Sequence, residues 1–240
     1  MSSVLALRLA GPLQSWGASA RFTRRTTESA PTKSGVIGML AAAAGIERGD
    51  DTQLAPLAAL RFGVRIDQPG TRIRDFHTAH HGITGKSMPL SERFYLADAV
   101  FVAAVEGEQA LLEMLDAAVR APVYPPFLGR RSCPPAGPVE LGLHIGARLE
   151  DVLAEIPWQA SAWYRRRHPA RAQQDLTVLR EAAAGEQSAA DALRDQPLSF
   201  AAAHRRHALR TVITTTVPAP GVPASVSPHD PFDALEDESS

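Results

Sequence analysis

The chain has 240 residues, which suffice for one large domain or two small packed ones. With 45% hydrophobic residues, 21% charged residues and a formal net charge of −1, its composition is that of a globular protein and argues against global disorder. The single cysteine, Cys133, excludes a disulfide scaffold and a cysteine-based zinc site, and no apolar run reaches the roughly 18 residues of a membrane span, so we expect a cytoplasmic protein with no membrane partner.

The first predicted element is a short apolar strand over residues 4–10, which is followed by a Gly-Pro turn. Residues 11–31 are mostly polar and predict a long loop. A helix is expected next, because Thr32 and Ser34 are candidate N-caps and the apolar residues after them recur at helical spacing. Gly45 is the expected stop at the C-terminus of this helix.

Three further strands, a polar excursion and a second helix follow in the sequence. Residues 60–67 alternate between apolar and polar side chains, which is typical of a half-buried strand, and residues 71–91 predict an excursion from the core. Residues 94–106 have the composition of another strand. Residues 109–120 carry leucines at helical spacing and predict a helix, after which residues 139–145 alternate as a strand does.

These elements have the order βαββαβ, which is the ferredoxin-like arrangement, so the expected fold class is α+β with both helices on one face of an open sheet. We expect residues 1–146 to form this unit and residues 147–217 to form a smaller C-terminal part packed on it. In that part, residues 150–155 and 173–184 suggest short helices, and the β-branched run 209–217 suggests a strand.

The charges are distributed unevenly along the chain. Residues 218–240 contain five acids, several prolines and no base, so we expect a disordered acidic tail there. The remaining residues 1–217 have a net charge of +4, and arginine outnumbers lysine 23 to 2 in the chain. Arginine offers planar, multi-donor contacts to phosphate groups, so each arginine cluster is a candidate contact with nucleic acid.

The start of the first helix is the first candidate binding site. A Walker loop is excluded, because that motif needs glycines before its Lys-Ser pair and residues 27–31 contain none. A helix N-terminus with free N–H groups and a lysine is nevertheless a general anion site, so a backbone phosphate is a plausible guest. The same residues are equally compatible with a plain capped helix beside a solvated loop. The polar groups concerned are Arg21, Arg24, Arg25, Thr32, Lys33 and Ser34.

The histidines of the polar excursion suggest two kinds of chemistry. His77, His80 and His81 lack the glutamate and the helical spacing of a histidine metal site, so no metal is expected. A metal-free ribonuclease needs a general base and a cationic or acidic group, and these histidines with Lys86 and Tyr95 supply the right types. Each of these side chains also has an ordinary role at the surface or in the core.

Residues 127–135 predict a compact basic loop. Gly129 permits a tight backbone, Arg130 and Arg131 present forked donors, and two prolines fix the exit. Such a loop suits contacts to phosphates or unpaired bases, although a rigid connection with solvated arginines explains it as well. The adjacent Cys133 is expected to be structural. Two further basic clusters, at 165–167 and 205–206, receive no predicted role.

Three stretches together resemble a known family. They are residues 7–17 (LRLAGPLQSWG), 31–40 (PTKSGVIGML) and 128–134 (LGRRSCP), and between them residues 75–78 (DFHT) and 93–99 (RFYLADA) occur in the expected order. The chain resembles the CasD family of CRISPR-associated proteins, the Cascade subunits of type I-E systems in the RAMP superfamily. The resemblance is specific over residues 4–145 and diffuse beyond them.

The resemblance implies a modified ferredoxin-like (RRM/RAMP) palm with a β-hairpin thumb, for which the excursion at 71–91 is the candidate. It implies a non-catalytic subunit, without cofactor or metal, that caps the 5′ handle of a guide RNA for antiviral DNA interference. The implied partners are the Cascade backbone subunit, the large subunit and, in the assembled complex, target DNA. Relatives in type I-C systems cleave RNA with Tyr, His and Lys, so a metal-independent endoribonuclease of CRISPR repeat RNA is the alternative.

The expected RNA contacts combine the basic loops with the resemblance. Lys33 and the neighbouring arginines are expected to hold phosphates, Arg130 and Arg131 to clasp the handle, and Trp16 either to stack on a base or to pack. The full set is Gln14, Trp16, Arg21, Arg24, Arg25, Thr32, Lys33, Ser34, Arg72, Arg74, His77, Arg93, Arg130, Arg131 and Ser132.

Overall fold

The computed structural model describes residues 2–17, 24–168 and 175–219. Arg21 and residues 220–240 of the predicted tail lie outside the described residues. None of the helices in the described part of the chain is long and apolar enough to cross a membrane. The elements are β1 (Ser2–Ala10), β2 (Leu13–Gln14), β3 (Arg24–Arg25), α1 (Lys33–Ala43), α2 (Asp51–Ala59), β4 (Arg61–Gln68), β5 (Thr71–His77), β6 (Ser91–Ala97), β7 (Val100–Glu108), α3 (Gln109–Arg120), β8 (Glu140–Ile145), α4 (Leu149–Glu155), α5 (Ala162–Arg167), β9 (Leu176–Arg180), β10 (Asp191–Ser199) and β11 (Arg206–Val217).

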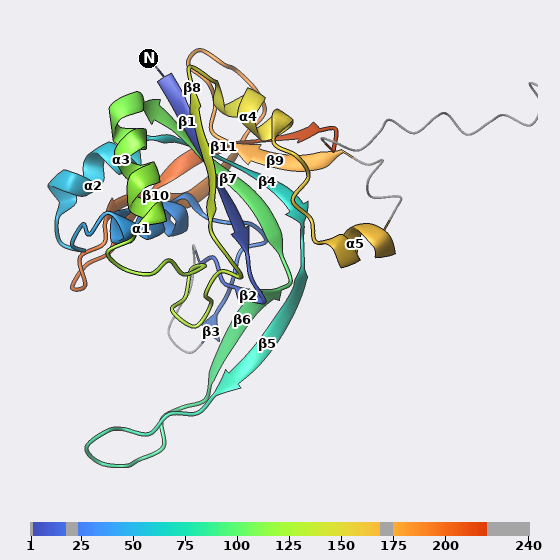
Figure 1. Ribbon diagram of the computed structural model, residues 1–240. Helices are drawn as coiled ribbons and strands as arrows, with labels where there is room; N and C mark the ends of the chain where they lie inside the picture. The colour runs from blue at the N-terminus through green and yellow to red at the C-terminus, as the bar shows by residue number, and fades with distance from the viewer. Residues whose placement is uncertain (1, 18–23, 169–174, 220–240) are drawn as a thin grey trace, which may run out of the picture.

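A seven-stranded antiparallel sheet forms the centre of the molecule, in the order β10-β11-β9-β4-β7-β1-β8. Leu5, Leu7 and Leu9 of β1 face the cluster formed by α1, α2 and α3, whereas Val4 and Ala6 face α4 on the other side. Figure 1 shows these helices on opposite sides of the sheet. Because β1 is buried on both faces, it is a nearly continuous apolar run. The predicted α+β class is confirmed to the extent that helices pack on antiparallel sheets.

The strands after residue 147 extend this same sheet. β9 pairs with β4 on one side and β11 on the other, and β10 forms the edge. The helix predicted over 173–184 is wrong: residues 173 and 174 lie outside the described part, and Leu176–Arg180 form β9. In β9 buried and half-buried side chains alternate with the period of a strand, and pairing on both edges decides the conformation.

β4 is buried along most of its length, so the prediction of a half-buried strand is wrong. Its Arg65 guanidinium is 0% exposed and pairs with Asp67, with Nε 2.7 Å from Oδ1. Arg65 also donates to the carbonyl oxygens of Leu153 and Ile156 at the end of α4, at 2.6 and 2.8 Å. A polar residue in the alternating pattern is therefore buried with its partners and fixes α4 to the sheet.

The predicted start and end of the first helix are confirmed. Thr32 is the N-cap, and its hydroxyl accepts from the Gly35 N–H at 3.3 Å. Gly45 has φ +76°, and the N–H groups of Gly45 and Ile46 donate to the carbonyls of Ala42 and Ala41, which is the Schellman pattern. The helix predicted over 109–120 is also confirmed, as α3.

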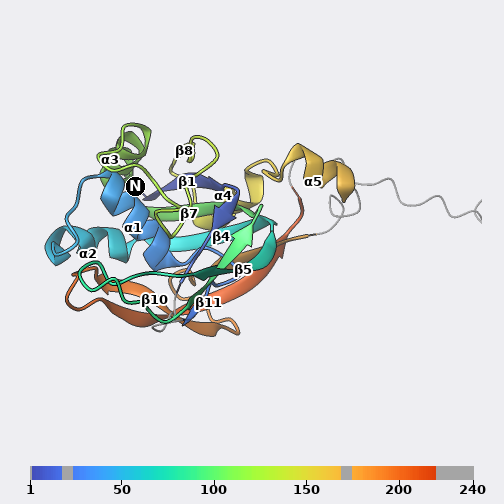
Figure 2. The ribbon, with the colours of Figure 1, turned by 90° about the horizontal axis from the view of Figure 1, so that it is seen from below.

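The second sheet contains the β5–β6 hairpin, which projects below the rest of the molecule in Figure 1 and lies toward the viewer in Figure 2. β5 lies along one edge of β6, and β2 and β3 pair with opposite ends of its other edge. The single strand predicted over 94–106 is wrong, because Asp98 turns the chain with φ +55°. This turn places β6 in the hairpin sheet and β7 in the large sheet, so the excursion extends over 71–97.

Candidate nucleic-acid interface

Three arginines from distant parts of the chain converge on β6. Arg25 of β3 is the register partner of Arg93. Arg130 lies with its guanidinium carbon 4.7 Å from the centroid of the Tyr95 ring, and its Nη2 donates to the Arg25 carbonyl at 2.9 Å. Arg93 and Tyr95 lie two residues apart on a strand and therefore share a face. We call Arg25, Arg93 and Arg130 the arginine cluster.

The loop that carries Arg130 is held by backbone hydrogen bonds and by the buried side chains of Leu128 and Cys133. The Leu128 N–H donates to the Cys133 carbonyl at 2.7 Å, and the Leu128 carbonyl accepts from the Ser15 N–H at 3.0 Å. Gly129 has φ +84°, and a Cβ there would lie 1.8 Å from the Ser15 oxygen, so only glycine fits. Burial raises the pKa of the Cys133 thiol despite the nearby Arg130, in line with a packing role. These contacts fix the backbone from which the Arg130 side chain extends.

The arginine cluster has cationic donors without protein partners. Arg93 Nε and Arg130 Nη1 are buried and lack a hydrogen-bond partner among the described residues. Within the same residues, no carboxylate forms an ion pair with Arg25, Arg93 or Arg130. Asp75 lies opposite Arg93 on β5, but its carboxylate pairs with His77 at 2.5 Å. Since an unsatisfied buried donor is costly, the cluster is suited to an anion such as a phosphate group.

Other predicted contacts lie on the opposite face of the hairpin. Arg72 and Arg74 are the register partners of Leu96 and Phe94, so strand alternation directs them away from Arg93. Arg72 donates to the Thr27 carbonyl at 2.9 Å, and the Arg74 guanidinium lies 4.7 Å from the Phe76 ring. The structure therefore does not bring Arg72 and Arg74 together with the arginine cluster.

Arg24 is the register partner of Glu92 on β6. Arg131 and Ser132 are exposed at the turn beside Arg130. They therefore extend the arginine cluster toward solvent.

At the start of α1, where an RNA phosphate is predicted, the structure places carboxylates of the protein itself. The Lys33 N–H donates to the Asp195 carboxylate at 2.7 Å, and the Lys33 ammonium lies 2.9 Å from Glu181. Asp195 is fully buried and also accepts from Arg210 at 2.6 Å. Burial lowers the pKa of Lys33, and the charge of Glu181 opposes this shift. The anion site at this helix start is real, but a carboxylate of the protein occupies it.

The remaining residues of this motif are buried as well. Thr32 caps the helix, and Ser34 lies beside it with 9% of its surface exposed. Gln14 donates to the carbonyls of Leu9 and Ala99 and accepts from the Trp16 indole N–H at 3.0 Å. Trp16 is 0% exposed. Of the two roles predicted for Trp16, the structure shows packing, and the side chains of Gln14, Thr32 and Ser34 are also buried.

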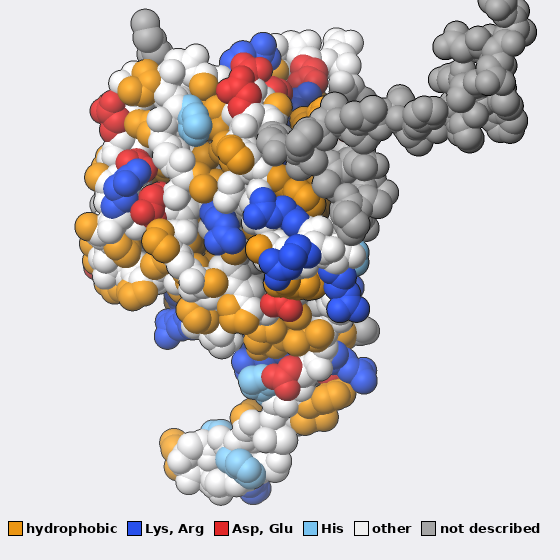
Figure 3. Space-filling view, turned by 45° about the vertical axis from the view of Figure 1, so that its right-hand side comes forward, with side chains coloured by type: hydrophobic (Ala, Val, Ile, Leu, Met, Phe, Trp, Pro, Cys, Tyr) orange, Lys and Arg blue, Asp and Glu red, His pale blue; other side chains and the backbone are white. Residues whose placement is uncertain are grey.

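The side chains expected for RNA cleavage are not assembled. His77 and Tyr95 lie four residues apart on paired strands, about 13 Å at 3.3 Å per residue. Tyr95 is buried under Arg130, whereas His80, His81 and Lys86 lie on the exposed hairpin tip, seen at the lower end of Figure 3. Among the described residues, no group of three or more His, Cys, Asp or Glu side chains is placed to hold a metal ion.

The sequence missed the supporting residues of the interface. The sequence predicts no RNA contact for Tyr95, yet its ring is the surface on which Arg130 lies. Its spacing of two from Arg93 on a strand is a signal that places both on one face. The backbone of Thr27, which fixes Arg72, carries no comparable signal in the sequence.

A family model and a curated relative both match this chain. A family model described as "CRISPR-associated protein (Cas_Cas5)" matches residues 4–213, from β1 into β11. The chain is 38% identical over 160 residues to "CRISPR system Cascade subunit CasD" of Escherichia coli (strain K12), covering 59% of this chain and 71% of the relative.

Two solved structures resemble the fold closely. "Crystal structure of Cas protein" has a TM-score of 0.68 at 35% identity and covers 90% of this chain and 95% of that chain. "CRISPR RNA-guided surveillance complex" has a TM-score of 0.68 at 33% identity and covers 91% of this chain and 94% of that chain. The similarity therefore extends over nearly the whole chain in both cases.

Proposed function

Since the chain belongs to the Cas5 family of CRISPR-associated proteins, we propose that it is a non-catalytic RNA-binding subunit of a type I-E Cascade surveillance complex. In this role it caps the 5′ handle of the guide RNA for antiviral DNA interference. The observation that carries the proposal is the arginine cluster, in which Arg93 and Arg130 have buried donors without partners among the described residues.

The geometry suggests how the handle is held. A guanidinium presents a planar fork that matches a phosphate, and stacking on Tyr95 fixes the plane of Arg130. Arg25 and Arg93 add two cationic side chains beside it, so the cluster suits a sharply bent backbone whose phosphates lie close together. His77 lies further along the same face, toward the tip. In this proposal the β5–β6 hairpin is the thumb and the large sheet is the ferredoxin-like palm.

The proposed partners are the guide RNA, the Cascade backbone subunit, the large subunit and, within the assembled complex, target DNA. The support comes from the relatives, one described as a Cascade subunit and another as part of an RNA-guided surveillance complex. That residues 147–217 form a smaller part of their own, packed on residues 1–146, stays a prediction.

A binding titration tests the proposal. Full-length protein is titrated against labelled RNA that carries a repeat-derived 5′ handle and against an RNA of permuted sequence. Arg93→Ala with Arg130→Ala should weaken handle binding and reduce the slope of log K against log salt by about 1.4, since each phosphate contact on a single strand contributes about 0.7. Arg120→Ala is the matched control, because this exposed arginine of α3 pairs with Asp116. Equal affinity and slope in the double variant would refute the assignment.

A denaturing gel separates capping from cleavage. Repeat RNA is incubated with the protein in EDTA. The proposal predicts uncut RNA, and discrete cleavage that His77→Ala abolishes would favour the endoribonuclease.

A further inference from the structure

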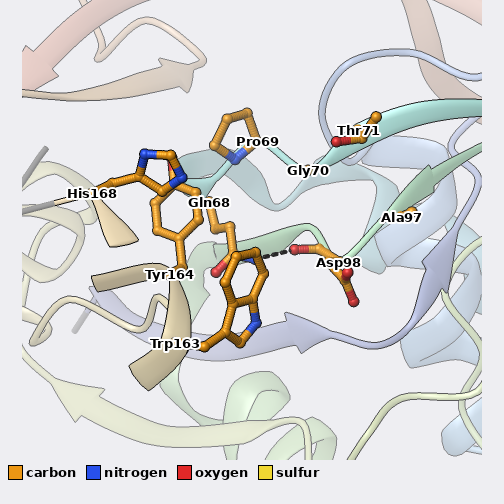
Figure 4. A pocket seen from close by; sticks show the side chains of 9 residues that line it. All are labelled: Gln68, Pro69, Gly70, Thr71, Ala97, Asp98, Trp163, Tyr164 and His168. Atoms are coloured by element: carbon orange, nitrogen blue, oxygen red, sulfur yellow. Dashed lines mark hydrogen bonds between the residues drawn. The ribbon is translucent and has the colours of Figure 1, made fainter. Parts of the chain in front are cut away.

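A pocket of about 220 Å³ lies between the end of β4, the root of the hairpin and α5 (Figure 4). It lies four residues along β6 from Arg93, at Ala97, and so is separate from the arginine cluster. Sites for drug-sized molecules have roughly 300–1,000 Å³, so this pocket has room for about one planar ring. The residues that define its chemistry are Gln68, Gly70, Asp98, Trp163, Tyr164 and His168.

The pocket is held in shape by hydrogen bonds between its walls. The Gln68 side chain donates to the Asp98 carbonyl and accepts from the backbone N–H and the hydroxyl of Ser161, at 3.1 and 2.9 Å. Ser161 is the N-cap of α5, so Gln68 joins this helix to the end of β4. The Trp158 indole N–H donates to the Asp67 carbonyl at 2.9 Å and fixes the approach to α5. These hydrogen bonds fix the positions of the pocket walls relative to one another.

One wall of the pocket is the exposed side chain of Trp163, which packs on the buried ring of Tyr164. Trp163 is 45% exposed, whereas Trp16 and Trp158 are 0% and 5% exposed. Its ring meets the Tyr164 ring edge to face, with centroids 5.8 Å apart, and Tyr164 contacts His168 at 4.6 Å. A supported indole with an open face is a platform on which an unpaired base stacks, whatever its identity.

The helix that presents Trp163 also carries positive charge. Arg166 and Arg167 follow Trp163 by three and four residues, so they lie beside the indole on the surface of α5. Arg165, Arg166 and Arg167 are exposed, and no carboxylate pairs with them within the described residues. Figure 3 shows Lys and Arg side chains gathered on this side of the molecule. Such charge beside an aromatic platform suits a phosphate backbone more than an apolar peptide.

Asp98 supplies an anionic acceptor at the opposite rim of the pocket. Asp98 is an exposed residue with φ +55°, and its carboxylate has no hydrogen-bond partner among the described residues. A carboxylate accepts hydrogen bonds from the exocyclic amino group of cytosine, which uracil lacks. The rim therefore favours a base with an amino group.

We infer that this pocket binds one unpaired base of a single-stranded nucleic acid, independently of handle capping. The base stacks on Trp163, Arg166 and Arg167 hold the adjacent phosphates, and Asp98 accepts from an amino group of the base. The strand is either RNA or DNA, since both present the same base and phosphate chemistry.

Tryptophan fluorescence tests this site directly, because Trp163 is the exposed one of the chain's three tryptophans. The full-length protein is titrated with cytosine tetramers of RNA and of DNA. We expect saturable quenching by at least one of them, and a preference between the two identifies the source of the strand. Quenching should persist in the Arg93→Ala, Arg130→Ala variant and vanish in Trp163→Phe. No quenching by either tetramer, or quenching that requires Arg93 and Arg130, would overturn the inference.

Affinity measurements with labelled tetramers give a second readout. Trp163→Ala should weaken binding by roughly 5- to 150-fold, the loss produced by removing one stacking contact. Tyr124→Ala is the matched control, because Tyr124 is 57% exposed and does not line the pocket. Asp98→Asn tolerates the same backbone and should reduce the preference for cytosine over uracil tetramers. Equal losses in the Trp163 and Tyr124 variants would contradict a specific site.

Discussion

Asp195 provides the sharpest test of how the start of α1 is stabilised. Its buried carboxylate accepts from the Lys33 N–H at 2.7 Å and from Arg210 at 2.6 and 2.9 Å. Removing one partner of a buried ion pair costs about 3–5 kcal/mol, because the remaining charge stays buried. Glu181, 3.7 Å from Arg210, offers partial compensation. We therefore expect Asp195→Ala to lower the free energy of unfolding by about 3 kcal/mol, toward the lower end of that range.

Urea unfolding and thermal melts measure this loss. For a chain of this size, 1 kcal/mol corresponds to roughly 2–4 °C in Tm, so the expected shift is roughly 6–12 °C. Asp191→Ala is the control, because Asp191 is exposed on the same strand, β10. Below the melting temperature, the affinity for handle RNA should change less than about twofold. Unchanged stability in Asp195→Ala would refute the reasoning, since the buried carboxylate would then not hold the start of α1.

Three further predictions concern Arg130, its loop and acid stability. Arg130→Lys keeps the charge but loses the planar fork and the stacking on the ring beneath, so handle RNA should bind about tenfold more weakly with an unchanged salt slope. Gly129→Ala forces a Cβ toward the Ser15 oxygen at φ +84°, so the free energy of unfolding should fall by about 1–3 kcal/mol, measured in urea, together with RNA affinity. The Arg180 guanidinium lowers the pKa of Glu186 from 4.5 to about 2. Because the folded state holds this carboxylate ionised, its contribution to stability is complete above pH 4.5 and is lost as the pH falls toward 2, which melts of Glu186→Gln against the parent protein should show as a smaller acid sensitivity.

Each of these predictions has a result that contradicts it. Wild-type affinity in Arg130→Lys would mean that only the charge matters at this position. Wild-type stability in Gly129→Ala, matched to Gly137→Ala where a Cβ meets open space, would mean that the loop does not need its glycine. An acid-induced loss that Glu186→Gln leaves unchanged would assign the acid sensitivity to other carboxylates.

Local patterns predicted the elements whose own residues decide their conformation. The helix over 109–120 follows from the spacing of its leucines, and the first helix from its Thr32 cap and its Gly45 stop. The helix α2 went unpredicted although Asp50 caps it, with Oδ1 accepting from the Gln53 N–H at 2.9 Å. That signal was present in the sequence.

The errors concern contacts between residues far apart in the chain. β9 is a strand because β4 and β11 pair with it, and neither partner is adjacent in sequence. Lys33 is buried because Asp195, 162 residues away, caps its N–H. Arg72 and Arg93 were grouped as contacts, but the register of β5 against β6 places them on opposite faces. The residue types in the sequence predicted a basic interface. Which arginines lie together in it depends on how the strands pair, and the sequence patterns did not show this.

The RNA that accompanies the protein in its own cells tests the central claim most directly. The tagged full-length chain is purified with its partners, and the 5′ ends of the bound RNA are sequenced, with the Arg93→Ala, Arg130→Ala variant in parallel. The account predicts guide RNAs that share one short repeat-derived 5′ end and are depleted in the variant. A folded protein without RNA, or with RNA whose 5′ ends are scattered, would contradict it.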